Sequence, residues 1–485
     1  MKPYLWDPWA TARTDPDRVA VIADGEESTY GDLTGRADAL ARGLRAHGIA
    51  DGAIVSTDIP TGPAFFALAL AALRHGFGLF PIDPDLLALP AGPSLLASVA
   101  TAAHISAEPR AGGPALPCPV LTDTELTARA ARAAGADGAD GADGADGASA
   151  SVPPPAAGRL VFATSGTTGL PQAVARARPR RPYRGVAVLE RYGAGAGRGP
   201  HLMANPTYHL GTLGPALYAL QAGSAVVVQR AWSCGAFTEL ADRHRADSVM
   251  LSPDRLIDLV GTGEAPHHPF RVVLHGGAAC PPAVKRAAMD LFGPVLHEYY
   301  GTSKGVITEI GTAEWLARPG SVGRPLPGIR VEITRDGRPL TAGETGDIGI
   351  RLRAADRDPS DADVLRTGDV GHVDDEGYLF VLGRAESPRE IRMARLEHDI
   401  RLLPGVTDAA VVDGAGDEPV CFVEHGDGST FPDPVTAIEA TADLLELPSP
   451  RTVLASSGSL PRTPSGKLRR ADLVVLARSA PDDAG

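Results

Sequence analysis

The sequence has few cysteines and no long apolar run. Its four cysteines, Cys118, Cys234, Cys280 and Cys421, lie far apart and show neither the CxxC pairing of a zinc site nor the density of a disulfide scaffold. The most apolar run, Ala64 to Leu73, is too short to span a bilayer, and no apolar core follows a basic start at the N-terminus. These absences predict a protein of the reducing cytoplasm, without a signal peptide or a membrane partner.

Positive charge is also scarce. The chain carries 46 Lys and Arg against 59 Asp and Glu, a formal net charge of −13. This balance offers no general attraction for a polyanion, so we expect no nucleic-acid partner. The 485 residues, 44% of them hydrophobic, are enough for a sizeable core and about two to four domains.

Helical and strand-like segments alternate through most of the chain. Helical spacing of apolar residues covers 30–44, 64–73, 236–245 and 282–291. Short apolar strands are predicted at 53–57, 77–84, 159–163, 224–228, 248–251 and 271–274. Such alternation is typical of an α/β domain with largely parallel sheets.

The sequence pattern changes beyond Gly323. Short alternating strands with glycine turns there predict a small antiparallel region (IRVEITRDGRPL, GDIGIRLR, GYLFVLGR). The last hundred residues resemble a separate α+β unit. We therefore predict a large domain over 1–383 and a small mobile domain over 384–485. Within the first, Gly135–Gly147 repeats Gly-Ala-Asp four times, which predicts a disordered loop at about 135–155. A calcium-binding repeat would need a longer period with apolar positions.

The segment LVFATSGTTGLP, residues 160–171, carries the strongest chemical signal. A strand runs into a turn of hydroxyl residues and glycines, whose N–H and O–H groups can surround phosphate oxygens. The segment lacks the GxxxxGK[ST] pattern, so P-loop chemistry does not follow, and taken alone it also fits a surface turn. The predicted phosphate ligands are Thr164, Ser165, Gly166, Thr167, Thr168 and Gly169.

Six further segments follow in order along the chain. They are Pro206-Thr207-Tyr208-His209, His275-Gly276-Gly277-Ala278, Tyr299-Tyr300-Gly301-Thr302-Ser303, Arg366-Thr367-Gly368-Asp369, Gly383-Arg384 and PRTPSGK at 461–467. With these motifs, the whole chain resembles the adenylate-forming superfamily: the acyl-CoA and aryl-CoA synthetases, firefly luciferase and the adenylation domains of peptide synthetases. It resembles an atypical member, close to the acyl-CoA ligase-like biosynthetic enzymes.

The resemblance implies a role for each motif. Lys467 is implied as the catalytic cation that bridges the acid carboxylate and the α-phosphate. His209 is implied in the gate of the acid pocket, and is counted with Lys467 among the catalytic residues; Glu386 is implied as the hinge. Asp369 is implied to hold the ribose hydroxyls, since one carboxylate can accept from both. The remaining nucleotide-binding residues are Gly276, Gly277, Ala278, Tyr299, Tyr300, Gly301, Thr302, Ser303 and Arg384.

The implied activity is that of an ATP-dependent ligase with Mg²⁺ as a further cofactor. A small or aromatic acid attacks the α-phosphorus of ATP, pyrophosphate leaves, and a small nucleophile captures the acyl adenylate. Rotation of the small domain about the hinge separates the two halves, so Lys467 serves only the first.

Three departures from the family pattern bear on this activity. Gln172 stands where a lysine follows the phosphate loop, and Lys304 stands where a glutamate helps to hold magnesium. The sequence therefore assigns no metal ligand: Lys304 replaces part of the metal's charge, Glu309 takes the metal, or the first half-reaction is impaired. The span 385–395 is short and lacks the glycine that packs along pantetheine, which favours an amine over CoA as acceptor.

Three alternatives stay open. The enzyme could activate nitrite and so convert an aromatic amine into a diazonium, as a diazotase. It could be an ordinary acyl-CoA ligase. It could also be a catalytically silent relative that binds nucleotide and acts as a regulatory or scaffolding partner, although the complete motif around Lys467 argues against this.

Overall fold

The computed structural model describes residues 8–110, 112–137, 158–163, 172–176, 199–302, 305–352, 364–414, 416, 418–426, 434–462 and 468–479. The chain forms two compact units, Met1–Met250 and Leu251–Gly485, each described below by itself. The domain boundary predicted at 383/384 falls within the second unit and stays a prediction.

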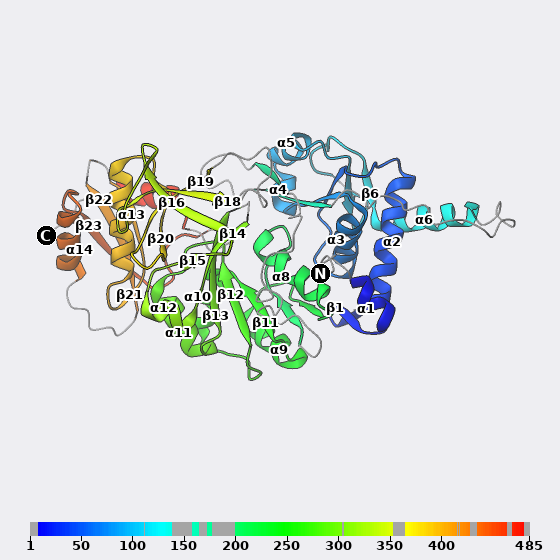
Figure 1. Ribbon diagram of the computed structural model, residues 1–485, viewed down its shortest axis with the longest axis horizontal. Coiled ribbons are helices and arrows are strands. Elements are labelled where there is room, and N and C mark those ends of the chain that lie inside the picture. The colour runs from blue at the N-terminus through cyan, green and yellow to red at the C-terminus, as the bar shows by residue number, and fades with distance from the viewer. Residues whose placement is uncertain are drawn as a thin grey trace. The chain divides into compact units, whose positions relative to one another are not determined.

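A six-stranded sheet of order β6-β5-β3-β4-β7-β8 lies in unit 1. Figure 1 labels its edge strand β6. All its pairs are parallel except β7 with β8. Every residue of β3, β4 and β5 is buried, as expected for a parallel sheet covered on both faces. The strands are β3 (Ile54–Thr57), β4 (Gly78–Pro81), β5 (Ala103–Ser106), β6 (Val120–Thr122), β7 (Arg159–Ala163) and β8 (Ala173–Arg176).

The helices of this part explain the apolar segments of the sequence. Helix α2 begins at a capping box in which Thr29 and Asp32 bond each other's backbone N–H groups. Helix α3 is buried over nearly its whole length, which accounts for the most apolar run of the chain. The helices are α1 (Pro8–Thr14), α2 (Tyr30–Ala46), α3 (Pro63–His75), α4 (Pro84–Ala88), α5 (Ala91–Ser98) and α6 (Asp123–Asp137).

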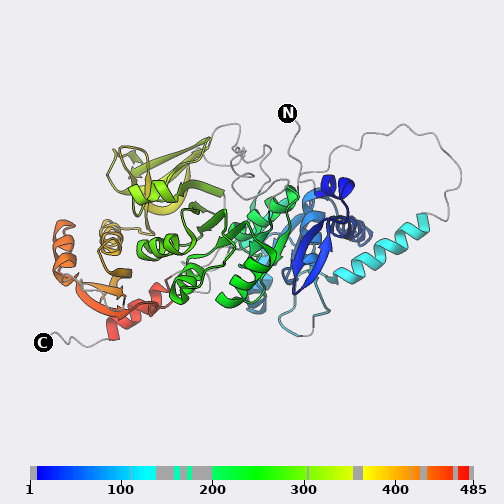
Figure 2. The same cartoon turned by 90° about the horizontal axis from the view of Figure 1, so that it is seen from below.

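Helix α6 packs on α2 at Gly43, where the backbone of Leu126 leaves no room for a Cβ atom. Its C-terminal end projects beyond α2 (Figure 2). The helix ends at Asp137, so the first three residues of the Gly-Ala-Asp tract are helical rather than part of a loop. The high helix propensity of the preceding alanines explains this extension. The rest of the predicted loop, 138–155, lies outside the described residues.

The second sheet region of unit 1 has the order β11-β9-β10-β1-β2, parallel except for the β1–β2 hairpin. The Tyr30 hydroxyl lies 2.8 Å from the carbonyl oxygen of Leu220 and 3.0 Å from that of Ser224, which ties α2 to this region. The elements are β1 (Val19–Ala23), β2 (Glu26–Thr29), β9 (His201–Met203), β10 (Val226–Val228), β11 (Ser248–Leu251), α8 (Leu210–Gln221) and α9 (Cys234–His244).

Unit 2 begins with strands in the order β12-β13-β14-β15, of which β12 and β13 are parallel and the others antiparallel. The strands are β12 (Val272–Gly276), β13 (Leu296–Thr302), β14 (Gly305–Gly311) and β15 (Arg324–Pro325). The helices are α10 (Pro253–Thr262), α11 (Pro282–Phe292) and α12 (Thr312–Ala317).

An antiparallel sheet of order β17-β16-β18-β19-β20 follows and confirms the antiparallel region predicted beyond Gly323. Buried Ile333, Ile348 and Leu379, from three of its strands, build its core. The strands are β16 (Ile329–Arg335), β17 (Arg338–Pro339), β18 (Gly346–Leu352), β19 (Leu365–Val373) and β20 (Leu379–Gly383).

The end of the chain forms a three-stranded sheet, β21-β22-β23, with helices packed on it, as predicted for an α+β unit. Its core joins Leu396 and Ile400 of α13 to Val411, Val423 and Ile438. The elements are α13 (Pro388–Arg401), β21 (Val406–Asp413), β22 (Pro419–His425), α14 (Pro434–Leu444), β23 (Arg451–Ser456) and α15 (Arg470–Ser479). Among the described residues, no helix has both the length and the apolar character needed to cross a bilayer.

Candidate active site

Three predicted nucleotide-binding residues from distant parts of the chain meet in unit 2. Tyr300 at the end of β13 donates a hydrogen bond from its hydroxyl to Asp369 Oδ2, at 2.6 Å. Arg384, just after β20, donates from Nε to Asp369 Oδ1, also at 2.6 Å. The Asp369 side chain is 14% exposed. The structure thus brings together a phenol ring, a carboxylate and a guanidinium. We call the group of Tyr300, Asp369 and Arg384 the corner.

The Thr-Gly-Asp motif is shaped to present this carboxylate. Thr367 Oγ1 accepts from the Asp369 N–H at 3.0 Å and donates to the carbonyl oxygen of Ile348 in β18, also at 3.0 Å. Gly368 has φ +78°, a conformation that favours glycine. A Cβ at this position would lie 2.8 Å from Nη1 of Arg384, so a larger residue would also displace the end of that side chain.

The electrostatics of the corner keep Tyr300 protonated. Burial raises the pKa of the Tyr300 hydroxyl, and the negative charge of Asp369 raises it further. Tyr300 is therefore a permanent hydrogen-bond donor. A carboxylate offers about four acceptor positions, of which Tyr300 and Arg384 take one on each oxygen. Asp369 can still accept from both hydroxyls of a ribose.

The predicted adenine-facing segments lie on neighbouring strands. Gly276 ends β12 directly opposite Tyr299 of β13. A Cβ on Gly276 would lie 2.6 Å from the carbonyl oxygen of Tyr299 and 2.9 Å from its ring, so the ring packs on the Gly276 backbone. Gly277, with φ +87°, and Ala278 continue from this edge. Gly301 and Thr302 end β13, and a Cβ on Gly301 would lie 2.5 Å from the carbonyl oxygen of Gly305.

A buried ion pair that the sequence did not predict supports these strands. Lys285 Nζ of α11 lies 2.6 Å from Glu298 Oε2 of β13, with side chains 1% and 9% exposed. Nζ also lies 4.7 Å from the centroid of the Trp315 ring. His275, opposite Glu298 in the register, is fully buried, and burial and the Lys285 charge hold its pKa well below the usual range. A helical lysine is normally interpreted as exposed, so no sequence signal marked this pair.

The sequence assigned no metal ligand, and the described residues do not supply one as a cluster of carboxylates. Glu309 of β14 lies opposite Tyr299, and its Oε1 is 3.3 Å from Nδ1 of His297. In the described ranges, no group of three or more His, Cys, Asp or Glu side chains is placed to hold a metal ion. Mg²⁺ in nucleotide enzymes takes most of its ligands from phosphates and water.

The predicted gate of the acid pocket lies in unit 1. His209 stands at the start of α8, and its ring centroid is 4.8 Å from that of Tyr208 in an edge-on contact. Tyr208 hydrogen-bonds the carboxyl group of Asp83, whose pKa is raised by burial. Thr207 Oγ1 lies 3.4 Å from Oγ1 of Thr61. Asp83 follows β4 at the carboxyl edge of the six-stranded sheet, where α/β folds commonly bind ligands.

The structure describes some of the remaining predicted residues and their surroundings and leaves others out. The roles of all of them stay predictions. Strand β7, which precedes the predicted phosphate loop, pairs with β4 and so ends at the same sheet edge as Asp83. The predicted hinge, Glu386, lies in the connection 384–387 between β20 and α13, and its N–H donates to Glu390 Oε2 at 2.6 Å. The residues outside the described part are Thr164, Ser165, Gly166, Thr167, Thr168, Gly169, Ser303, Lys304 and Lys467.

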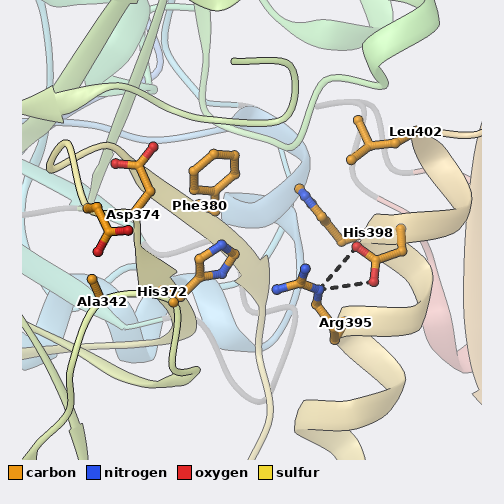
Figure 3. Close-up of a pocket in the computed structure, with 10 residues that line it drawn as sticks. Ala342, His372, Asp374, Phe380, Arg395, His398 and Leu402 are labelled. Carbon is orange, nitrogen blue, oxygen red and sulfur yellow. Dashed lines mark hydrogen bonds and ion pairs between the residues drawn. The ribbon is translucent and has the colours of Figure 1, made fainter. Parts of the chain in front are cut away.

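A separate cavity of about 330 Å³ lies between β19, β20 and α13 (Figure 3). His372 and Phe380 stack at 4.8 Å on one side, and Arg395, paired with Asp399, lies on the other. Burial lowers the pKa of His372 to about 4 and that of His398 to about 3, so both rings are neutral at pH 7. None of the predicted nucleotide residues lines this cavity, and no motif in the sequence pointed to it.

Two curated proteins are similar to this chain over nearly its whole length. A sulfoacetate–CoA ligase of Cupriavidus necator is 29% identical over 95% of this chain and 95% of its own length. Triostin synthetase I of Streptomyces triostinicus is 26% identical over 97% of this chain and 93% of its own. The similarity thus includes acyl-CoA ligases as well as a synthetase of another kind.

Solved structures share the fold. The amide bond synthetase McbA of Marinactinospora thermotolerans is 25% identical with a TM-score of 0.71, over 98% of this chain and all of its own. The o-succinylbenzoate–CoA synthetase of Bacillus subtilis, solved with ATP and magnesium, is 20% identical with a TM-score of 0.72, over 97% of this chain and 99% of its own. The sequence pattern of the AMP-binding enzymes matches residues 8–354. The chain therefore belongs to the AMP-binding enzyme family and is an ATP-dependent, AMP-forming ligase.

Proposed function

We propose that this ligase activates a small or aromatic carboxylic acid as its AMP anhydride and transfers the acyl group to an amine. An oxygen of the acid attacks the α-phosphorus of ATP, and pyrophosphate leaves with the electrons of the broken bond. The amine then attacks the acyl carbon and displaces AMP, losing one proton as the amide forms.

The corner of Tyr300, Asp369 and Arg384 supports the nucleotide part of this proposal. Two charge-assisted or buried hydrogen bonds fix the Asp369 carboxylate, so little reorganisation is needed when ribose hydroxyls bind. Lys467 is assigned to the charge that develops between the acid and the α-phosphate. His209 and Tyr208, whose rings are in contact, are assigned to the acid pocket.

The connection between β20 and α13 carries the choice of acceptor. Gly383 ends β20 and Pro388 begins α13, whose first turn is capped when Ser387 Oγ accepts from the Glu390 N–H at 3.2 Å. The helix continues to Arg401, so 388–395 is helical where the resemblance implies a glycine loop along pantetheine. An acceptor without pantetheine suits this geometry, and the similarity to an amide bond synthetase points the same way.

The test is steady-state turnover of the purified chain with ATP and Mg²⁺. Pyrophosphate release is measured across a panel of aliphatic and aromatic carboxylic acids and nitrite. AMP formation is then measured for each active acid with CoA, an aliphatic amine and an aromatic amine, and products are identified by mass spectrometry. We expect an aryl or small carboxylic acid to release pyrophosphate and an amine, but not CoA, to accelerate AMP formation.

Each rival function has its own outcome in this experiment. A CoA thioester, with stimulation by CoA alone, would identify an ordinary acyl-CoA ligase and overturn the argument from α13. A diazonium formed from nitrite and the aromatic amine would identify a diazotase. ATP binding without pyrophosphate release from any acid would identify a silent relative.

A further inference from the structure

Two buried carboxylates and three arginines form a network in the C-terminal part of unit 2, in which the Arg401 and Arg462 side chains are mostly buried and that of Arg470 is 49% exposed. We call Glu397, Arg401, Asp408, Arg462 and Arg470 the arginine–carboxylate cluster. Glu397 and Arg401 come from α13, Asp408 from β21, and Arg470 is the first residue of α15. Glu397 is 1% exposed and Asp408 is 2% exposed.

Arg401 joins the two carboxylates at the centre of the cluster. Its Nη1 lies 2.9 Å from Glu397 Oε1, and its Nε donates to Asp408 Oδ1 at 2.7 Å. Arg470 Nη2 donates to the same Glu397 oxygen at 2.7 Å, and Arg462 pairs with Asp408 Oδ2. Each outer arginine is thus anchored on one carboxylate of a connected pair.

Backbone groups complete the bonding of both carboxylates. The Val411 N–H donates to Glu397 Oε2 at 2.9 Å, and the Ala409 N–H donates to Asp408 Oδ1 at 2.8 Å. Burial by itself raises the pKa of Glu397, but Arg401 and Arg470 outweigh it, and the net shift is downward. Glu397 is therefore ionised, and the hydrogen bonds give the cluster a fixed geometry.

The two outer arginines flank the segment that contains Lys467. Arg462 lies before 463–467 and Arg470 after it, and the segment itself is outside the described residues. Arg462 and Leu468 form an antiparallel bridge, and the Arg469 N–H donates to the Pro461 carbonyl oxygen at 2.8 Å. The Leu460 N–H also donates to the buried Glu424, at 2.6 Å. The chain is consequently fixed to one rigid base at both ends of this segment.

We propose that the arginine–carboxylate cluster is a positioning device for Lys467 in the adenylation half-reaction, an inference that rests on the proposed function. A long, flexible lysine stabilises charge in a transition state only if its backbone is held in place, and a displacement of about 1 Å can cost roughly 100-fold in rate. The cluster provides that support from α13 and β21, without touching substrate. Its members are positioning residues.

The test compares Arg470→Met with the matched control Arg469→Met. Arg469 is the adjacent arginine, and its side chain is 55% exposed, close to the 49% of Arg470. Among the contacts described it pairs with the exposed Asp472, whereas Arg470 pairs with the buried Glu397. Pyrophosphate release is measured with an acid active in the panel above. We expect Arg470→Met to lower kcat about 10- to 100-fold with KM for ATP nearly unchanged, because Tyr300 and Asp369 are untouched. We expect Arg469→Met to behave as wild type.

A double variant separates positioning from general damage. In a Lys467→Ala background, Arg470→Met should remove little further activity, because both changes act through the same cation. Capture of a synthetic acyl adenylate by the amine should be unaffected. An equal loss in both backgrounds, an equal loss in the capture step, or wild-type activity of Arg470→Met would each overturn the proposal.

Hydrogen exchange keeps the inference separate from the proposed function. The Arg469 amide, bonded to Pro461, should exchange faster in Arg470→Met and in Asp408→Asn than in wild type. Unchanged exchange in both variants would show that the cluster does not hold the segment. Absence of pyrophosphate release by the wild-type chain would instead refute the proposed function, and the exchange result would still report on the cluster's hold on the segment.

Discussion

At the scale of single residues, the most informative contact is the pair of hydrogen bonds that Asp369 receives. Tyr300 and Arg384 each occupy one oxygen of the carboxylate from a fixed direction. The side chain is therefore oriented without a nucleotide, and substitutions at this position should change binding rather than folding. Lys467 differs from Asp369, because its assigned role is in the transition state, where charge develops between the acid and the α-phosphate, and not in nucleotide binding.

Asp369→Ala should raise KM for ATP about 10- to 100-fold, because hydrogen bonds to a charged group contribute about 1.5–3 kcal/mol. Asp369→Asn, which keeps one acceptor oxygen, should have a smaller effect. Initial rates over a range of ATP concentrations at saturating acid measure this. Unchanged ATP dependence in Asp369→Ala would mean that the Thr-Gly-Asp motif is only a turn.

Lys467→Ala should lower kcat for pyrophosphate release by about 10²- to 10³-fold, equivalent to roughly 3–4 kcal/mol of lost transition-state stabilisation. The melting temperature should stay that of the wild type, because the role assigned to Lys467 exists only when charge develops in the reaction. Near-full pyrophosphate release by this variant would refute the assignment.

A buried histidine should make the stability of the first unit depend on pH. His201 in β9 is 1% exposed, its Nδ1 lies 3.0 Å from Ser248 Oγ, and burial lowers its pKa to about 3. Below pH 6.5 the unfolded chain binds a proton that the folded chain does not, so stability falls as the pH falls. Between pH 7 and 5, urea unfolding of wild type should lose about 2 kcal/mol more than that of His201→Asn. Equal losses would show that His201 titrates normally.

At the scale of elements, helix α11 is attached to strand β13 by the Lys285–Glu298 pair. Both side chains are buried, so removing one partner leaves an uncompensated charge. Lys285→Met should lower the free energy of unfolding by about 3–5 kcal/mol. The neighbouring exposed residue gives the control: Arg286→Met should cost less than about 1 kcal/mol. Denaturant titration measures both, and Lys285→Met/Glu298→Leu should recover part of the loss.

The tract after helix α6 should be dispensable. Deletion of 138–147, which leaves the helix intact to Asp137, removes only glycine, alanine and aspartate. No side chain larger than Asp is lost and none is strongly apolar, so melting temperature and pyrophosphate release should be nearly unchanged. A fall of several degrees in the melting temperature would show that the tract packs against the unit.

Element positions were largely predictable from the sequence, and contacts between elements were not. Strands β7 and β11 have the bounds predicted from their apolar runs, and the capped start of α2 follows from Thr29 and Asp32. Periodicity gives no information on which distant residues meet. The contact of Tyr300 with Asp369 and the inward direction of Lys285 depend on sheet order, and so required the structure.

At the scale of the whole molecule, the connection 384–387 should control the passage from the first half-reaction to the second. Glu386→Pro removes the N–H that donates to Glu390 and fixes the backbone angle φ of residue 386. Glu386→Gln keeps this N–H and leaves φ free to rotate. We expect Glu386→Pro to keep the single-turnover release of pyrophosphate and to slow amide formation about tenfold or more. Glu386→Gln should resemble wild type.

Rapid-quench measurement of both products distinguishes the two effects. Equal slowing of pyrophosphate release and amide formation by Glu386→Pro would show that the connection supports the fold instead of a hinge. Unchanged rates for both products would place the hinge elsewhere in the chain.

The boundary between the two compact units has a consequence for engineering and for recombination in evolution. It falls between Met250 and Leu251, inside β11, whose four residues are all buried. A crossover or a split-protein junction at this point would cut a strand and leave unpaired backbone groups at the new ends. The two halves are therefore poor exchangeable cassettes. Insertions are better tolerated at exposed turns such as Asp336-Gly337 between β16 and β17.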